Sequence, residues 1–164
     1  MYGIRPQINH EVNEKYPTSL VRNIRVTDKQ TLEKVIDING RNKIIIESAL
    51  SSKSLDLSSD NKENKVASGN FITARPLGVI DGVDMQFSGQ IRRIDETSIK
   101  NKLDNKEIVI VSPLGFSPIG DIFNLSYEKT AAHVSSAINA DKLIFYTNHD
   151  GIPVSYTHLT LPTN

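Results

Sequence analysis

The stretch SGNFITARPLGVIDGVDMQFSGQIRRID, residues 68–95, determines how the rest of the chain is interpreted. It carries no apolar repeat of helical period, and Asp81-Gly82 is a strong turn signal because glycine adopts positive φ without steric cost. We therefore predict a β-ribbon with arms near Asn70–Ala74 and Met85–Ile94, joined through Ile80-Asp81-Gly82. A two-stranded ribbon is not stable alone, so a larger body must carry it.

The composition limits the kind of protein that this body belongs to. At 164 residues, the chain suits one domain with a real core. The 19 Lys and Arg balance the 19 Asp and Glu, so we expect neither nucleic acid nor a membrane as a partner. The absence of cysteine excludes a disulfide framework, and no signal peptide or long apolar run is present. We expect a cytoplasmic protein.

A metal site is not expected either. The chain has no cysteine thiolates, and its four histidines are scattered without the spacing that a metal site requires: His10, His133, His149 and His158.

Two helices are predicted ahead of the ribbon. Pro6 suits the first turn of a helix that includes Ile8 and Val12. Thr27-Asp28-Lys29-Gln30 has the pattern of a capping box, with the Thr27 hydroxyl as N-cap. The apolar face that follows predicts one long helix, or two helices broken near Gly40, because glycine in a helix interior costs about 1 kcal/mol relative to alanine. The polar segment Ser51–Lys65 is expected to be a solvated connection.

The part after the ribbon predicts an α/β class. Glu107–Val111 is an unalternating apolar run, typical of a strand that is covered on both faces of a parallel sheet. Lys142–Tyr146 is a second candidate of this kind. Residues 107–146 therefore predict a right-handed βαβ unit. The other elements expected here are a helix at Glu96–Leu103, a turn-rich loop at Ser112–Gly120, and a helix capped by Ser126 that carries Ala131, Val134 and Ile138 on one face.

The two ends of the chain show neither the apolar repeat of a helix nor that of a strand. Val154–Asn164 resembles the translation of a sequencing-library adaptor, so we expect residues 153–164 to be a non-native tail and residues 1–152 to be the domain. Met1–Ile8 reads like the end of a strand-to-helix turn whose strand is absent. We therefore expect a domain that is truncated at both ends.

Three blocks, Tyr2–Ile8, Asn23–Glu33 and Ser68–Asp95, resemble the amino-acid-kinase-like domain of bacterial N-acetylglutamate synthases, which use acetyl-CoA in arginine biosynthesis. Asn124–Glu128 and Lys142–Ile152 extend the resemblance in weaker form. It implies an open, mostly parallel sheet flanked by helices in three layers, with the ribbon at about 70–95 projecting at one end. In the related acetylglutamate kinases this end closes over the acetylglutamate site.

The resemblance also implies a division of labour. A separate C-terminal domain transfers acetyl from acetyl-CoA to L-glutamate, while the kinase-like domain mediates homo-oligomerisation and inhibition by arginine. We expect this chain to hold no catalytic residue and no cofactor, with acetyl-CoA as a co-substrate of the longer protein. L-glutamate, N-acetylglutamate and arginine are the expected small-molecule partners. Two alternatives stay open: a divergent acetylglutamate kinase using MgATP, and a non-catalytic arginine sensor or oligomerisation module.

Four residues match the kinase pocket: Gly3, Arg25, Asn124 and Glu128. The kinases have a run of glycines at Gly3-Ile4-Arg5, because backbone N–H groups must approach phosphate there, and the side chains of Ile4 and Arg5 argue against phosphoryl transfer. Arg25 matches an arginine that grips a substrate carboxylate, and Asn124 matches a second substrate-binding position. Glu128 is one methylene longer than the kinases' organising aspartate.

We therefore expect a vestigial pocket at these four positions. The alternative is a purely structural role, in which Arg25 pairs with a local acid, Asn124 turns the chain and Glu128 stabilises a helix end.

The arginines of the ribbon could suggest an anion or nucleic-acid contact. Arg75, Arg92 and Arg93 are offset by nearby acids, namely Asp81, Asp84, Asp95 and Glu96. A structural or interdomain salt bridge is the favoured interpretation.

Overall fold

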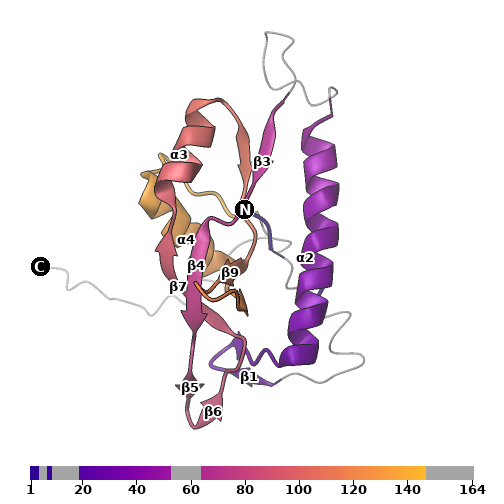
Figure 1. Cartoon of the computed structure of the whole chain (residues 1–164), viewed down its shortest axis with the longest axis vertical. Coiled ribbons are helices and arrows are strands. Elements are labelled where there is room, and N and C mark those ends of the chain that lie inside the picture. The colour runs from indigo at the N-terminus through magenta and orange to yellow at the C-terminus, as the bar shows by residue number, and fades with distance from the viewer. Residues whose placement is uncertain (4–6, 9–18, 53–63, 147–164) are drawn as a thin grey trace, which may run out of the picture.

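The computed structural model describes residues 1–3, 7–8, 19–52 and 64–146. Most of the helix predicted around Pro6 and Val12, most of the polar connection at 51–65 and the whole of the tail at 153–164 lie outside the described residues. Figure 1 shows helix α2 on one side of the strands and helices α3 and α4 on the other. The expected α/β class with helices on both sides of a sheet is confirmed.

The central sheet has four strands in the order β10-β9-β4-β7. Antiparallel ladders join β4 to β7 and β9 to β10, and a parallel bridge joins Thr73 in β4 to Phe116 in β9. A separate parallel pair is formed by β3 and β8. Parallel and antiparallel pairing therefore occur together in the described residues. The strand bounds are β3 Val66–Ser68, β4 Ile72–Pro76, β7 Gly89–Ile94, β8 Ile108–Ile110, β9 Leu114–Phe116 and β10 Ile122–Asn124.

The predicted ribbon is confirmed. β4 and β7 form its base, and the short strands β5 (Val79–Ile80) and β6 (Val83–Asp84) form its tip, which projects at the lower end of Figure 1. Asp81 and Gly82 make the turn with φ of 50° and 80°, as a tight hairpin requires. Between tip and base, Leu77 donates to Ser88 and Met85 donates to Gly78, each at 2.9 Å, so the two arms stay hydrogen-bonded.

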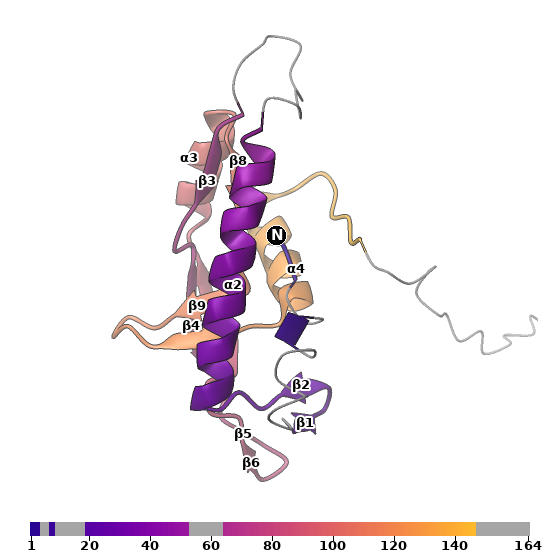
Figure 2. The same cartoon turned by 90° about the vertical axis from the view of Figure 1, so that its right-hand side faces the viewer.

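Helix α2 runs without interruption from Lys29 to Leu50, past Gly40. Figure 2 shows it extending along the molecule in front of β4 and β9. The predicted Thr27 cap is wrong: Asp28 is the N-cap, and its carboxylate accepts from the Thr31 amide at 2.7 Å. Thr27 is fully buried, and its hydroxyl bonds instead to the side chains of Ser88, just before β7, and of Asn124 in β10.

The two helices predicted after the ribbon are confirmed as α3 (Glu96–Asp104) and α4 (Tyr127–Ile138). Ser126 caps α4 as expected, and Asp95 caps α3. Side chains of both helices, Ile99 and Val134, share a core with Ile72 and Ala74 of the sheet and with neighbouring apolar residues. On the other side, Val35 and Ile38 of α2 pack with Leu114 of β9. No described helix is long and apolar enough to cross a membrane.

Two expectations after α3 are wrong. The segment at Ser112–Gly120 is more than a loop, because Leu114–Phe116 forms strand β9 inside the sheet. Lys142–Tyr146 is not a buried strand: it pairs with no described strand, and Tyr146 is 96% exposed. A strand needs a ladder partner as well as apolar residues, so residues 107–146 do not form the predicted βαβ unit.

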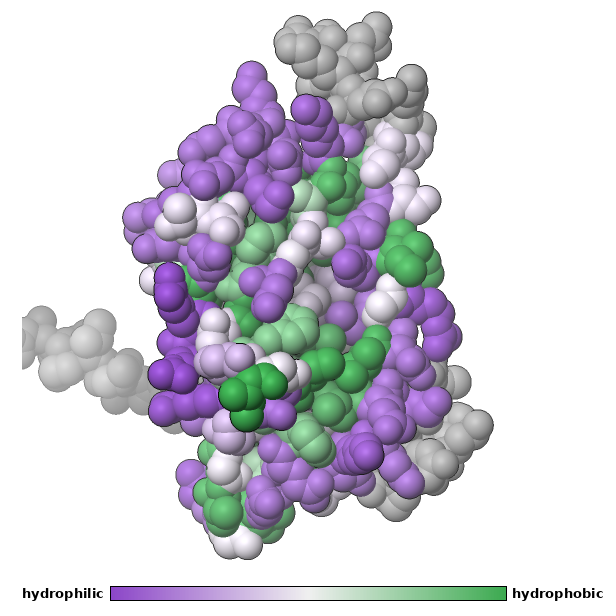
Figure 3. All heavy atoms as spheres, viewed as in Figure 1, coloured by the Kyte–Doolittle hydropathy of each residue, from purple (hydrophilic) through white to green (hydrophobic). Residues whose placement is uncertain are grey.

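Figure 3 shows where apolar and hydrophilic residues lie on one face of the molecule. Apolar residues gather in the middle of this face, and hydrophilic residues surround them. A second apolar group lies at the lower end, where Figure 1 places β5 and β6, and Val79 and Val83 at this ribbon tip are exposed.

Candidate functional site

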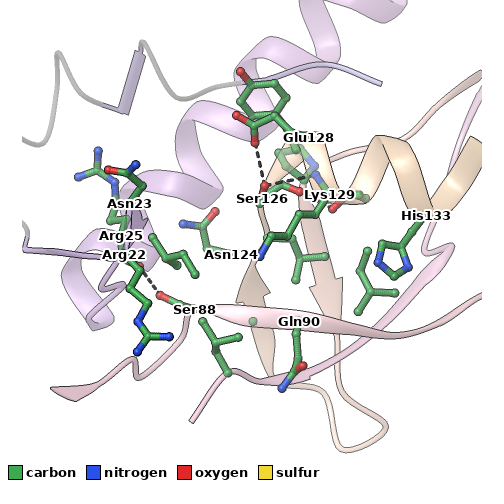
Figure 4. Close-up of a pocket in the computed structure, with 18 of the residues that line it drawn as sticks. Arg22, Asn23, Arg25, Ser88, Gln90, Asn124, Ser126, Glu128, Lys129 and His133 are labelled. Carbon is green, nitrogen blue, oxygen red and sulfur yellow. Dashed lines mark hydrogen bonds between the residues drawn. The ribbon is translucent and has the colours of Figure 1, made fainter. Parts of the chain in front are cut away.

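A cavity of about 590 Å³ lies where β2 (Ile24–Arg25), the start of β7, the end of β10 and the first turns of α4 meet. Three of the four predicted pocket residues, Arg25, Asn124 and Glu128, line it. Ten of its polar and charged lining residues are labelled in Figure 4: Arg22, Asn23, Arg25, Ser88, Gln90, Asn124, Ser126, Glu128, Lys129 and His133. The structure therefore brings together most of a site that sequence similarity alone suggested.

Two buried hydroxyls, of Ser88 in the cavity lining and of Thr27 next to it, are hydrogen-bonded to each other. The Ser88 hydroxyl lies 2.5 Å from the Arg25 carbonyl oxygen and 3.0 Å from the Thr27 hydroxyl. The Thr27 amide also donates to Ser88 Oγ, at 3.0 Å. Asn124 Nδ2 donates to Thr27 Oγ1 at 3.1 Å. Backbone bonds from Phe87 to Thr27 and from Asn124 to Phe87, each at 2.9 Å, hold the three segments in register.

The charged side chains of the lining are mostly cationic. Arg22, Arg25 and Lys129 carry positive charge, and Glu128 is the one carboxylate among the residues that line the cavity. Figure 4 places Asn124 between Arg25 on one side and Lys129 on the other. Arg22 is already engaged, since its Nε and Nη2 contact the Asp81 carboxylate at 2.8 and 2.5 Å. The arrangement favours a small anionic ligand, because guanidinium and ammonium groups bind carboxylates by charge-assisted hydrogen bonds.

Glu128 lies in the first turn of α4, where a negative charge complements the helix dipole. The Ser126 hydroxyl donates to Glu128 Oε2 at 2.8 Å and also accepts from the Lys129 amide at 3.3 Å. The carboxylate is therefore turned back toward the helix cap. Glu128 therefore does stabilise a helix end, as the purely structural role proposes, although it also lines the cavity.

Gly3 does not line the cavity. A Cβ added to Gly3 would lie 3.1 Å from the aromatic ring of Tyr127, so this glycine packs closely against the ring. The neighbouring Tyr2 hydroxyl donates to Asn39 Oδ1 at 2.6 Å. Burial, followed by the charge of Glu47, raises the pKa of Tyr2 to about 12. Gly3 and Tyr2 thus line a second, smaller pocket, and Tyr127 lines both this pocket and the cavity.

Sequence reasoning missed several lining residues. Ser88, Lys129 and His133 carry no recognisable motif. Thr27, which holds Ser88 and Asn124 from outside the lining, is predicted only as a helix cap. Among the described residues, no group of three or more His, Asp or Glu side chains is placed to hold a metal ion. Arg93 in the ribbon lies close enough to Asp95 to contribute to the lowered pKa of that carboxyl.

The chain thus folds as an α/β domain that has helices on both sides of a sheet and a ribbon beside a cavity lined by cationic side chains. The sequence profile of the Amino acid kinase family matches residues 2–158. The chain belongs to this family.

Proteins of known name resemble the chain over most of its length. It is 42% identical over 153 residues to the amino-acid acetyltransferase of Ralstonia nicotianae, which covers 93% of this chain and 34% of that protein. The amino-acid acetyltransferase of Ectopseudomonas mendocina is also 42% identical, with 93% and 35% covered. The chain therefore spans about a third of the length of these curated relatives.

A solved structure gives the same picture. The N-acetylglutamate synthase of Neisseria gonorrhoeae, complexed with coenzyme A and L-arginine, superposes with a TM-score of 0.84 at 34% identity. The superposition covers 92% of this chain and 36% of that chain. The same synthase complexed with coenzyme A and N-acetyl-glutamate superposes with a TM-score of 0.80.

Proposed function

We propose that this chain is the kinase-like part of an N-acetylglutamate synthase. In that protein a separate domain transfers acetyl from acetyl-CoA to the amine of L-glutamate, and this part is regulatory. The observation that carries the proposal is the 42% identity to an amino-acid acetyltransferase over 93% of the chain. Because the chain spans only 34% of that relative, the acetyl-transfer chemistry is assigned to the remainder of the longer protein.

The cavity gives the regulatory part a place to bind a small amino-acid ligand. Arg25 and Lys129 supply cationic groups, and Asn124 supplies a carboxamide between them. Arginine and N-acetylglutamate are the candidate ligands, since the Neisseria gonorrhoeae synthase has been solved with each of them. The role of the cavity as a retained, non-catalytic pocket is part of the proposal.

Two features support binding rather than phosphoryl transfer. The Tyr127 ring covers Gly3, where the related kinases bring backbone N–H groups to phosphate. Glu128, at the position of the kinases' organising aspartate, is held at the helix cap by Ser126. A phosphoryl-transfer site depends on accurate positioning of its metal-organising carboxylate. An acetylglutamate kinase is therefore the second candidate.

Two assays on the whole gene product that contains this chain separate the candidates. One measures release of CoA from acetyl-CoA with and without L-glutamate, and the other measures ADP formation from MgATP with N-acetyl-L-glutamate. We expect glutamate-dependent CoA release and ADP at the level of the no-substrate control. Substrate-dependent ADP formation would establish the kinase instead. Absence of both products would leave the sensor or oligomerisation module as the function.

The remaining expectations form part of the same proposal. The longer protein is expected to form a homo-oligomer in the cytoplasm, and arginine is expected to inhibit it. Residues 1–152 would be the kinase-like part, and residues 153–164 would not belong to it. Size-exclusion chromatography with light scattering, and CoA release measured across an arginine titration, test the first two points.

A further inference from the structure

The hydroxyls of Thr27 and Ser88 are buried, come from different segments, and meet beneath the cavity. Thr27 precedes α2, whereas Ser88 precedes β7, and the two residues are 0% and 2% exposed. The isolated bridges Thr27–Gln86 and Ser88–Asn124 bring them beside β10. Burying two hydroxyls is costly unless each finds partners, so their bonding pattern is strongly constrained.

The distances assign a direction to this pattern. A hydroxyl has one proton to donate, and that of Ser88 goes to the Arg25 carbonyl oxygen, its shortest contact at 2.5 Å. In the 3.0 Å contact between the two hydroxyls, Thr27 is then the donor and Ser88 the acceptor. The Thr27 oxygen is left to accept, and it accepts from Asn124 Nδ2 at 3.1 Å. The hydrogen bonds therefore all point the same way: Asn124 donates to Thr27, Thr27 donates to Ser88, and Ser88 donates to the Arg25 carbonyl oxygen.

This order fixes the Asn124 carboxamide. A carboxamide has a donor end and an acceptor end, and which end faces a ligand is decided by the bonds of the other end. Thr27 holds the NH₂ end, so the oxygen, Oδ1, is the end that Asn124 presents to the cavity that it lines. The same chain of bonds anchors the backbone of Arg25 to the base of the ribbon.

We propose that Thr27 and Ser88 are positioning residues of this cavity: their hydroxyl relay orients the Asn124 carboxamide so that it accepts an N–H group from the ligand. The inference rests on the proposed function of the cavity as an amino-acid-ligand pocket. Neither hydroxyl needs to touch the ligand. A ligand with an N–H near its carboxylate is favoured over one that places an oxygen there, because two acceptors would otherwise face each other.

The test uses two probes that differ only at this group. N-acetyl-L-glutamate carries an amide N–H, and (S)-2-acetoxyglutarate has an ester oxygen in its place. Isothermal titration calorimetry on the whole gene product gives the ratio of their dissociation constants. We expect the wild type to prefer the amide about tenfold, which corresponds to about 1.4 kcal/mol, the size of one hydrogen bond.

The variants separate positioning from general damage. Thr27→Val removes the acceptor that holds Asn124 Nδ2, so the carboxamide can turn its NH₂ toward the ester, and the preference should fall to about twofold or less. Thr27→Ser keeps the hydroxyl and should keep the wild-type ratio. Ser135→Ala removes an exposed hydroxyl on α4 that donates to the Ala132 carbonyl, and it is the matched control.

Ser88→Ala provides a second variant if Thr27→Val does not fold. Without the Ser88 acceptor, the Thr27 hydroxyl can donate to Asn124 Oδ1 instead, and the preference should again fall. A ratio that stays at the wild-type value in folded Thr27→Val or Ser88→Ala overturns the proposal, as does failure of the wild type to bind either probe at millimolar concentration. The CoA-release assay reads the proposed function separately: release of CoA with an unchanged ratio overturns only the positioning role.

Discussion

The base and the tip of the ribbon belong to one hairpin but are held by different forces. At the base, Ile72 and Ala74 lie in the main core, and Ser88 is 2% exposed. At the tip, Val79 is 67% exposed, and Asp81 reaches the rest of the chain through an exposed ion pair with Arg22. Apolar packing excludes water over a large area, whereas an exposed ion pair contributes about 0–1 kcal/mol. The base therefore stabilises the fold, and the tip tolerates change.

The strongest test of this difference removes a side chain where the tip joins the base. Met85 is completely buried, so Met85→Ala should leave a cavity and lower the free energy of unfolding by about 3–4 kcal/mol. Val79→Ala at the exposed tip is the matched control and should change it by less than about 0.5 kcal/mol. Urea denaturation followed by circular dichroism gives both values. Equal losses would show that the tip is packed as tightly as the base.

A second test adds one methyl group instead of removing a side chain. A Cβ on Gly89 would lie 2.5 Å from Phe123 Cβ and 3.0 Å from Leu125 Cδ2, so Gly89→Ala should destabilise the protein by about 2–3 kcal/mol. The same substitution at Gly40 meets no atom within 4 Å and lies inside α2. Gly40→Ala should therefore stabilise the protein by about 0.5–1 kcal/mol. Melting temperatures that shift in the same direction would contradict this account.

The comparison also explains which parts of the fold the sequence could predict. The ribbon turn is a local feature, since the two adjacent residues Asp81 and Gly82 form it with positive φ, and its prediction was correct. The cap of α4 by Ser126, which was predicted correctly, is equally local. Strand β9 was missed because its ladder depends on partners in β4 and β10, and because Gly115 inside it resembles a turn residue. A Cβ at Gly115 would lie 2.5 Å from Ala74 Cβ, so this glycine permits close strand packing.

The candidate site depends even more on contacts between residues that are far apart in the sequence. Thr27 bonds to Ser88, 61 positions away, and to Asn124, 97 positions away, so no local pattern could distinguish its role from a helix cap. Arg25, Asn124 and Glu128 were found through resemblance to a family, and the cavity brings these three together. Lys129 has no motif and follows only from the position of α4 beside the cavity. Long-range pairing of polar groups is the information that the sequence alone did not provide.

A smaller effect should appear in acid at the end of the ribbon. Hydrogen bonds from the Ser98 hydroxyl and then from its amide hold the pKa of Asp95 below its ordinary value. A carboxyl with a lowered folded-state pKa stabilises the protein fully above its unfolded pKa, and this contribution is lost as pH falls through the folded pKa. Stability should therefore decline below about pH 4.

The contribution of Asp95 to this loss of stability can be measured from its slope against pH. Asp95→Asn can still cap α3 but does not titrate, so urea midpoints measured between about pH 6 and pH 3 should fall less steeply than in the wild type. Asp141→Asn, an exposed carboxylate beyond α4, is the control. A slope for Asp95→Asn that equals that of the wild type would show that the Ser98 hydrogen bonds do not couple this carboxyl to folding.

The weakest expected effect lies at the ribbon tip. Arg22 and Asp81 each occupy a turn with positive φ, at 49° and 50°, and their side chains join the turn between β1 (Leu20–Val21) and β2 to the β5–β6 turn. The side chain of Arg22 is 71% exposed and that of Asp81 is 50% exposed. A double-mutant cycle with Arg22→Gln and Asp81→Asn should therefore give a coupling energy of no more than about 1 kcal/mol. Repeating the cycle in 1 M NaCl, where the Debye length is about 3 Å, should remove most of it. A coupling that survives high salt would mean that the two turns are docked by more than this ion pair, and the contrast between base and tip would then be smaller than the exposure of the tip indicates.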